Sequence, residues 1–192
     1  MTNPKNIAIL ASGSGSNAEK IIQYFKNHKE INVTCLITNN ENAGAIERAE
    51  KANVPSKYFS KSDFEHSAFI LQYLKSNNVD FIVLAGFLLK IAPEIIAEYP
   101  NRIINIHPAL LPKYGGKGMY GSYVHEAVIL NKEEESGITI HLVNENYDEG
   151  EVIFQAKCKI TPQMGAKQLA AVVQQLEHQH FPKVIEEFVE KY

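Results

Sequence analysis

Asn105 and His107 stand two residues apart at the end of an apolar run that begins at Ile103. Side chains two apart on a strand point to the same face, so an amide and an imidazole project together. Pro108 ends the strand directly behind them, because proline cannot donate to a strand ladder. A neutral donor beside a titratable ring is typical of a site that stabilises an oxyanion and transfers a proton. The plainer alternative is a strand end whose polar side chains satisfy loop backbone.

A second polar segment, Ser12-Gly13-Ser14-Gly15-Ser16-Asn17, joins the first expected strand to the first expected helix. Glycines let backbone amides approach a ligand, and a helix N-terminus favours an anion. The spacing is not G-x-G-x-x-G, which disfavours a dinucleotide site, and the Gly-Lys-Ser/Thr of a P-loop is absent. The segment therefore predicts a monophosphate site, with helix capping by Ser16 or Asn17 as the alternative.

Two further polar residues follow in the second half of the chain. His141 lies in an expected strand over residues 138–143, and Asp148 lies in a turn ahead of the next strand. Aspartate is common in turns for conformational reasons alone, so Asp148 by itself indicates little.

Strands and helices alternate along the chain and must position these groups. The alternation predicts an α/β fold, with a Rossmann-like, doubly wound, mostly parallel sheet, an antiparallel C-terminal strand region and a long C-terminal helix. Ligands bind at the carboxyl ends of the strands in such a sheet, where both polar motifs fall. Strands are expected over residues 7–10, 31–38, 57–59, 81–84, 103–106, 138–143 and 152–160, and helices over 18–25, 44–52, 65–77, 93–99, 121–130 and about 165–192, the last interrupted near Pro182.

Composition narrows the class of protein. The 192 residues are 45% hydrophobic and 21% charged, which predicts one domain, 1–192, with a substantial core. A formal net charge of -3 gives no basic field for nucleic acid. The strongest apolar run, 81–89, is too short to span a membrane. Cys35 and Cys158 suggest neither a disulfide framework nor a zinc site, and no signal peptide is visible, so a cytoplasmic protein is expected.

Taken together, the motifs resemble the formyltransferase family. The segment 105–112, Asn-Ile-His-Pro-Ala-Leu-Leu-Pro, with Asp148 downstream is that family's motif, and 84–87, His141 and Asp148-x-Gly150-x-x-Ile153-x-Gln155 occur in the same order. The loop over 12–17 narrows the resemblance to the phosphoribosylglycinamide formyltransferases, the folate-dependent enzymes of purine biosynthesis. The resemblance extends from the first strand to residues 177–178.

This resemblance implies transfer of a formyl group from 10-formyltetrahydrofolate to the amine of 5′-phosphoribosylglycinamide. It implies that Asn105 and His107 stabilise the tetrahedral oxyanion and relay protons, and that Asp148 orients His107 and a water molecule. No metal, nucleic acid or membrane is expected, and the chain would act as a monomer or homodimer. Residues about 1–100 would bind the phosphate and ribonucleotide, and about 101–192 would carry catalysis and folate binding.

The resemblance also assigns binding residues, with two departures from the family pattern. Residues 87–91 are Phe-Leu-Leu-Lys-Ile, where the family has Phe-Met-Arg-Ile. The family also has an arginine near the phosphate, and Lys61 is its expected substitute in this chain. Lys117, in a glycine-rich insert, is either a second anion contact or a solvated charge. His141 is a further site residue. The implied ribonucleotide contacts are Gly15, Ser16, Asn17, Lys61, Gln174 and Glu177, and the implied folate contacts are Phe87, Leu88, Leu89, Lys90, Ile91, Val143 and Asp148.

Three other functions remain open at this point. A hydrolase of 10-formyltetrahydrofolate would use water in place of the amine, but it would not need the glycine loop. A transferase acting on initiator methionyl-tRNA would be expected to carry an RNA-binding domain and a basic surface. A non-catalytic binder of a phosphorylated precursor would leave Asn105, His107 and Asp148 converging without purpose.

Overall fold

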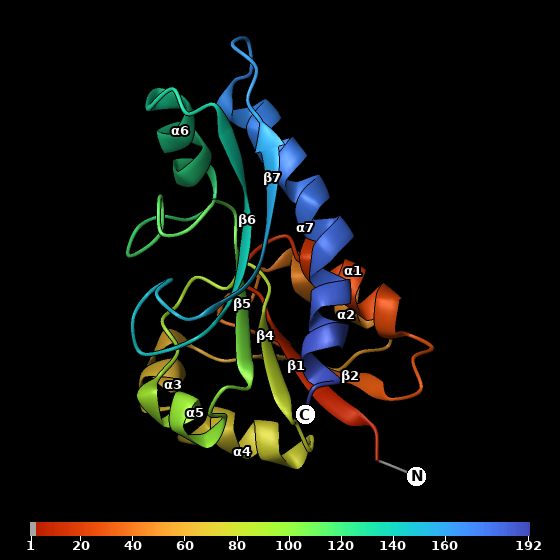
Figure 1. Ribbon diagram of the computed structural model, residues 1–192. Helices are drawn as coiled ribbons and strands as arrows, with labels where there is room; N and C mark the ends of the chain where they lie inside the picture. The colour runs from red at the N-terminus through yellow and green to blue at the C-terminus, as the bar shows by residue number, and fades with distance from the viewer. Residues whose placement is uncertain (1–2) are drawn as a thin grey trace.

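A seven-stranded sheet with helices on both faces forms the fold (Figure 1). The computed structural model describes residues 3–192. The strand order is β3-β2-β1-β4-β5-β6-β7, parallel from β3 to β5 and antiparallel at β6 and β7. The predicted fold class is therefore confirmed. The elements are β1 (Lys5–Leu10), α1 (Ser16–Phe25), β2 (Ile31–Thr38), α2 (Gly44–Lys51), β3 (Ser56–Tyr58), α3 (Lys61–His66), α4 (Ala68–Ser76), β4 (Phe81–Leu84), α5 (Pro93–Glu98), β5 (Ile103–His107), α6 (Ser122–Leu130), β6 (Glu135–Leu142), β7 (Val152–Lys159) and α7 (Ala166–Val189).

The parallel strands are buried on both faces, and alternate residues of β1 serve separate cores. Ile7 and Ile9 join the core beneath α1, α2 and α7, whereas Ala8 and Leu10 join the core beneath α4 and α5. Figure 1 shows these two groups of helices on opposite sides of the sheet. Burial on both faces explains why β1 and β4 read as continuous apolar runs in the sequence.

The prediction of a single helix over 65–77 is wrong, because two helices occupy this region. α3 begins at Lys61 and α4 begins at Ala68, and Ser67 between them is left-handed with φ 41°. A capping box in which Ser60 and Asp63 exchange hydrogen bonds starts α3 earlier than the apolar spacing indicated. Ser67 is buried and its hydroxyl reaches Glu94, so tertiary contacts hold the break.

The prediction that the last helix is interrupted near Pro182 is also wrong, because α7 continues through Pro182 from Ala166 to Val189. An interior proline costs a helix roughly 3 kcal/mol. Pro182 is flanked by buried Phe181, Val184 and Ile185, each of which gains about 1.5–3 kcal/mol from burial. Packing against the sheet therefore outweighs the cost of the proline.

The order of the strands creates the place for a site. β1 and β4 lie side by side in the sheet. The helix that follows β1 is α1, on one face, and the helix that follows β4 is α5, on the other face. Ligands bind at such a switch point, outside the carboxyl ends of the strands. The glycine loop after β1 and the Asn105–His107 end of β5 both lie at this edge. Within residues 3–192, no helix combines the length and apolarity needed to cross a membrane.

Candidate active site

Asn105 and His141 are brought together by the pairing of β5 with β6. The two residues are register partners, and the Asn105 Nδ2 lies 3.1 Å from the His141 Nε2. The His141 Nδ1 lies 2.7 Å from the Leu142 carbonyl, so Nδ1 carries a ring proton, and Nε2 faces both the Asn105 amide and Asp148 Oδ1, the latter at 3.5 Å. The second N–H of Asn105 faces Asp148 Oδ1 at 3.5 Å, a long contact that leaves this donor available.

His107 is buried beside this pair, with an acceptor at each ring nitrogen. Its Nε2 donates to the Tyr114 carbonyl at 2.7 Å, and its Nδ1 lies 3.5 Å from Asp148 Oδ2. Burial lowers the pKa of His107 below its ordinary value, against the opposing effects of Asp148 and the Tyr114 carbonyl. Because both nitrogens face acceptors, the ring can hold a second proton when one arrives.

Asp148 joins the two histidines from the loop between β6 and β7. The Gly116 N–H donates to its Oδ2 at 2.8 Å. Burial raises the pKa of the carboxyl, but contacts with His141, His107 and Gly116 outweigh burial and hold the pKa below its ordinary value. Asp148 has φ 56°, a left-handed conformation that aspartate tolerates well. The structure therefore brings all three predicted catalytic residues together.

Gly150 explains the spacing of the Asp148-x-Gly150 motif. A Cβ at Gly150 would lie 1.7 Å from the Leu142 carbonyl oxygen, which is the group that fixes the His141 tautomer. Gln155 of the same motif acts on the other side of the site. Its side-chain amide donates to the Leu111 carbonyl and to the Thr139 hydroxyl, which holds the loop that follows β5.

A cavity of about 450 Å³ opens beside the glycine loop, and we call it the glycine-loop cavity. Gly15 caps α1 with φ 76°, and a Cβ there would lie 2.5 Å from the Ala45 Cα, so only glycine fits. The α1 N-terminus thus faces the cavity with Ser16 and Asn17 in its first turn. Free backbone N–H groups and the helix dipole make this end of the cavity suitable for an anion.

Gln174 and Glu177 of α7 line the same cavity and contact the first turn of α1. The Gln174 amide donates to the Ser16 hydroxyl at 3.0 Å, and the Asn17 amide donates to Glu177 at 2.8 Å. Burial raises the pKa of Glu177 above its ordinary value. Five of the six predicted ribonucleotide contacts therefore share one cavity.

Lys61 is the exception among these contacts. It leaves 76% of its side chain exposed on α3, and it does not line the glycine-loop cavity. The basic residue that does touch the glycine loop is Arg48 of α2, whose Nε donates to the Ser14 carbonyl at 2.8 Å. Arg48 also pairs with Glu19 of α1. Sequence reasoning missed Arg48, because its place depends on how α2 packs beside the loop.

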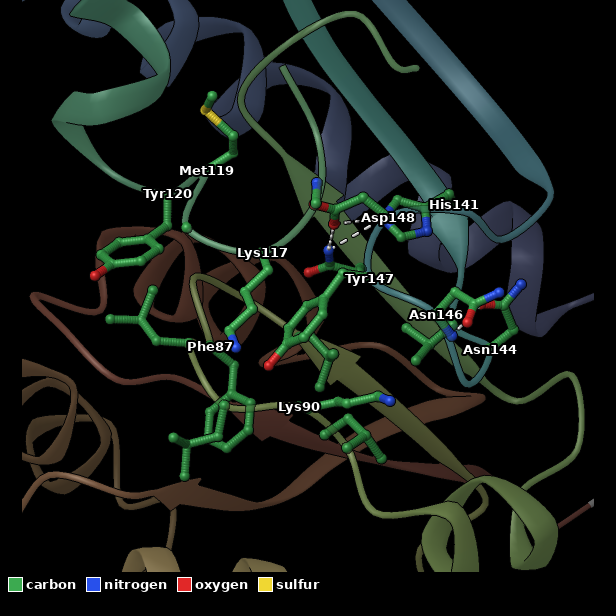
Figure 2. Close-up of a pocket in the computed structure, with 18 residues that line it drawn as sticks. Phe87, Lys90, Lys117, Met119, Tyr120, His141, Asn144, Asn146, Tyr147 and Asp148 are labelled. Atoms are coloured by element: carbon green, nitrogen blue, oxygen red, sulfur yellow. Dashed lines mark hydrogen bonds and ion pairs between the residues drawn. The ribbon is translucent and has the colours of Figure 1, made fainter. Parts of the chain in front are cut away.

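A second cavity, of about 320 Å³, is called here the Tyr147 cavity. All seven predicted folate contacts line it, together with His141. Figure 2 shows Tyr147 between Lys117 and Lys90 at its mouth, and the Lys90 ammonium lies 5.9 Å from the Tyr147 ring centroid. The segment 116–120 supplies further lining, including Met119 and Tyr120, which the sequence analysis did not assign.

Asn105 lines both cavities, as do Phe87, Leu88, Met119 and Tyr120. A ligand in each cavity would therefore meet its neighbour at the Asn105 amide. His107, two residues further along β5, is not part of either lining.

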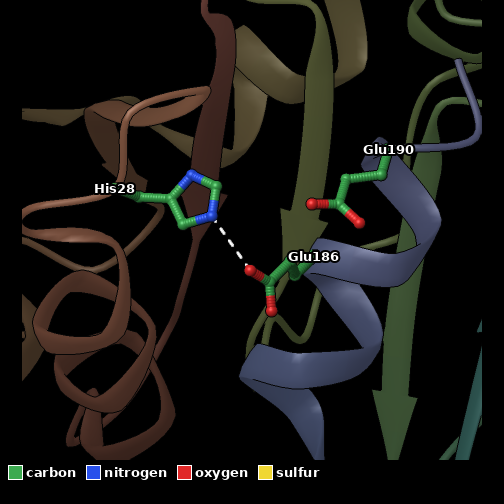
Figure 3. Close-up of side chains that lie close together, drawn as sticks. All are labelled: His28, Glu186 and Glu190. Atoms are coloured by element: carbon green, nitrogen blue, oxygen red, sulfur yellow. Dashed lines mark hydrogen bonds and ion pairs between the residues drawn. The ribbon is translucent and has the colours of Figure 1, made fainter.

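One group of side chains in the described residues has the composition of a metal site. His28, Glu186 and Glu190 gather on the surface between the turn after α1 and the end of α7 (Figure 3). The His28 Nδ1 accepts from the backbone N–H groups of Glu30 and Ile31, so Nε2 carries the proton and donates to Glu186. A protonated ring nitrogen cannot bind a metal, and the arrangement fits a hydrogen-bonded surface cluster.

The sequence and the fold match a known class of proteins. The model of the formyl transferase family matches residues 5–185, and the chain belongs to this family. It is 35% identical to the phosphoribosylglycinamide formyltransferase of Haemophilus influenzae, over 97% of this chain and 88% of that protein. The solved phosphoribosylglycinamide formyltransferase of Bacillus halodurans is 33% identical, with a TM-score of 0.89 over 97% of this chain and 96% of that one.

Plant relatives are longer than this chain. The chloroplastic phosphoribosylglycinamide formyltransferase of Arabidopsis thaliana is 37% identical over 94% of this chain but only 64% of its own length. The chain thus spans just under two thirds of the plant relatives it matches.

Proposed function

We propose that the chain transfers the formyl group of 10-formyltetrahydrofolate to the amine of 5′-phosphoribosylglycinamide, a step of purine biosynthesis. The observation that carries this proposal is the position of Asn105, which borders two separate cavities. A transferase with two substrates needs a polar group where their reacting atoms meet. The activities for which the relatives are named agree with this proposal.

The ribonucleotide would occupy the glycine-loop cavity. Its phosphate would bind the amides of Gly15, Ser16 and Asn17 at the N-terminus of α1, and its ribose hydroxyls would bind Glu177 and Gln174. Lys61 would add a charge only by turning from its present position toward the loop.

The folate would occupy the Tyr147 cavity. Its pterin would lie against residues 87–91 and the loop from Val143 to Asp148, which supply backbone groups and apolar surface. These backbone groups would hold the folate although the side chains at 88–90 differ from the family pattern.

Formyl transfer needs an oxyanion donor at the junction. The neutral amine attacks the formyl carbon, a C–N bond forms, and the carbonyl oxygen becomes an oxyanion. The available N–H of Asn105 would donate to this oxygen, and protonated His107, held by Asp148, would stabilise its negative charge. Removing one such donor typically raises the barrier by about 3 kcal/mol.

The bond from the formyl carbon to the folate nitrogen then breaks, and that nitrogen takes a proton that the amine has lost. His107 or an ordered water would relay this proton, and Asp148 would orient both. Besides the C–N bond that forms and the C–N bond that breaks, this sequence needs only proton transfers and hydrogen bonds, and we propose that no metal takes part.

A folate-release assay tests the proposal. Absorbance would follow tetrahydrofolate production from 10-formyltetrahydrofolate, with and without phosphoribosylglycinamide. Release that requires the ribonucleotide is expected. Release without it would mean a hydrolase, and no release would leave a binding protein, so either result would overturn the proposal.

Three broader features belong to the same proposal. Residues about 1–100 would supply the phosphate end and about 101–192 the catalytic and folate end, although both cavities take side chains from each part. The chain would act as a monomer or homodimer. It would work in the cytoplasm, where free Cys35 and Cys158 stay reduced.

A further inference from the structure

His125 is a buried histidine that the proposed mechanism does not use. It lies in α6, leaves 6% of its surface exposed, and lines the glycine-loop cavity. The other buried residues of α6, Val124 and Val128, are apolar. A polar ring in such a position lowers stability unless a hydrogen bond compensates for its burial. Packing alone therefore does not account for a histidine here.

The hydrogen bonding of His125 is incomplete. Its Nδ1 is shielded from solvent and has no partner among residues 3–192. Buried donors without an acceptor are rarer in proteins than buried acceptors without a donor, so the ring proton belongs on Nε2. Because Nδ1 is closed off, Nε2 is the nitrogen that a ligand in the cavity can reach.

The surroundings keep this ring neutral. Burial lowers the pKa of His125, and the nearby His107 lowers it further. His107 cannot partner the ring, because its nitrogens already face Tyr114 and Asp148. Asn105 and Pro108 line the same cavity as His125, and His107 of the same strand end is close enough to His125 to affect its pKa, so His125 lies toward the Asn105 end of this cavity.

We infer that His125 is a further substrate-binding residue, whose Nε2–H donates to an uncharged oxygen of the ribonucleotide between its ribose and its amine. The inference rests on the proposed function and assigns one more contact within that site. A neutral donor suits an amide carbonyl, whereas the phosphate is met by the α1 N-terminus. Nothing else in the described part of α6 offers a buried donor to this cavity.

Two substitutions separate the ring nitrogens. His125→Gln places an amide near the position of Nε2, and His125→Asn places it near Nδ1. Calorimetry with phosphoribosylglycinamide should show roughly five- to tenfold weaker binding for His125→Asn, as expected for loss of one neutral hydrogen bond, and less than about threefold for His125→Gln. Ribose 5-phosphate, which lacks the glycinamide, should bind both variants as it binds wild type. His66→Gln, on exposed α3 surface, is the matched control.

Each other result overturns the inference. Equal affinity of His125→Asn and wild type would make the ring structural, and an equal loss with ribose 5-phosphate would move the contact to the phosphate or ribose. If wild type itself fails to bind phosphoribosylglycinamide, the proposed function fails with it, which is a distinct outcome. If the asparagine variant unfolds, ¹⁵N NMR of wild-type imidazoles decides, because an Nε2 signal of His125 unmoved by the ribonucleotide excludes the contact.

Discussion

The two cavities that meet at Asn105 are built differently. The glycine-loop cavity is closed by side-chain hydrogen bonds between helices, from Asn17 to Glu177 and from Ser16 to Gln174. The Tyr147 cavity is lined mostly by connecting segments, 87–91, 116–120 and 143–148. The glycine-loop cavity therefore combines loop backbone with side chains held on helices, whereas the shape of the Tyr147 cavity depends mostly on loop backbone.

This difference separates the substitutions that should damage chemistry from those that should damage binding. The groups between the cavities act on the transfer step, whereas each lining acts on one ligand. Four sets of substitutions test this distinction between effects on chemistry and effects on binding.

His107→Ala should have the largest effect. Loss of a proton relay typically lowers turnover by about 10²–10⁴-fold, and the ring is not part of the glycine-loop cavity lining, so affinity for the ribonucleotide should stay within a few-fold. Folate-release kinetics give turnover, and calorimetry gives affinity. Near-normal turnover would remove His107 from the mechanism. A matched loss of affinity would show that the two roles are not separate.

Gly15→Ala and Gly150→Ala should each damage one region. The first would push against Ala45 and the second against the Leu142 carbonyl, and overpacking of this kind costs roughly 1–3 kcal/mol. We expect weaker ribonucleotide binding from the first and a higher KM for folate from the second. Gly13→Ala is the control for stability, since a Cβ there meets no atom within 4 Å. Thermal unfolding and the two KM values measure the outcome, and an identical pattern for both variants would contradict the distinction.

The sequence predicted the side chains of this site better than its backbone. Asn105 and His107 were predicted from their types and their positions at a strand end, whereas Asp148 was predicted only from the resemblance to the formyltransferase family. The Tyr114 carbonyl and the Gly116 N–H were missed, although both contact these residues, because any residue type supplies such groups and only the path of the loop places them. The glycine-rich composition of 115–118 indicated flexibility but gave no path.

Packing between elements was equally hard to predict. Strand and helix order followed from apolar periodicity, which depends on local sequence. The break at Ser67 and the continuous helix at Pro182 depend on contacts with distant segments, and local patterns contain no information on these. Arg48 was missed for the same reason.

Glu177→Gln should weaken ribonucleotide binding about tenfold while raising stability, if a charged hydrogen bond to the ligand is lost. Burial raises the pKa of Glu177 above the ordinary value of 4.5, so the folded state holds this proton more tightly than the unfolded chain does. The contribution of Glu177 to stability is thus complete at low pH and is lost as pH rises through the folded pKa.

The free energy of unfolding of the variant should therefore increase relative to that of wild type as pH rises above 4.5. Denaturation at several pH values, beside calorimetry, measures both changes. A variant that is less stable at pH 7 and binds normally would show that Glu177 is structural.

The smallest effect should come from the basic residues near the loop. Arg48 holds the Ser14 carbonyl and pairs with Glu19, so Arg48→Ala should loosen the glycine loop. Ribonucleotide binding should weaken about threefold to tenfold, less than for direct loss of a charge-assisted hydrogen bond to the ligand, because Arg48 acts through the loop. Lys61→Ala should change affinity less than twofold if the side chain stays on the surface of α3, as an exposed charge contributes little. Calorimetry at low and high salt compares the two. A larger loss for Lys61→Ala than for Arg48→Ala would mean that α3 turns its lysine onto the phosphate, and the glycine-loop cavity would then depend on a moving segment as the Tyr147 cavity does.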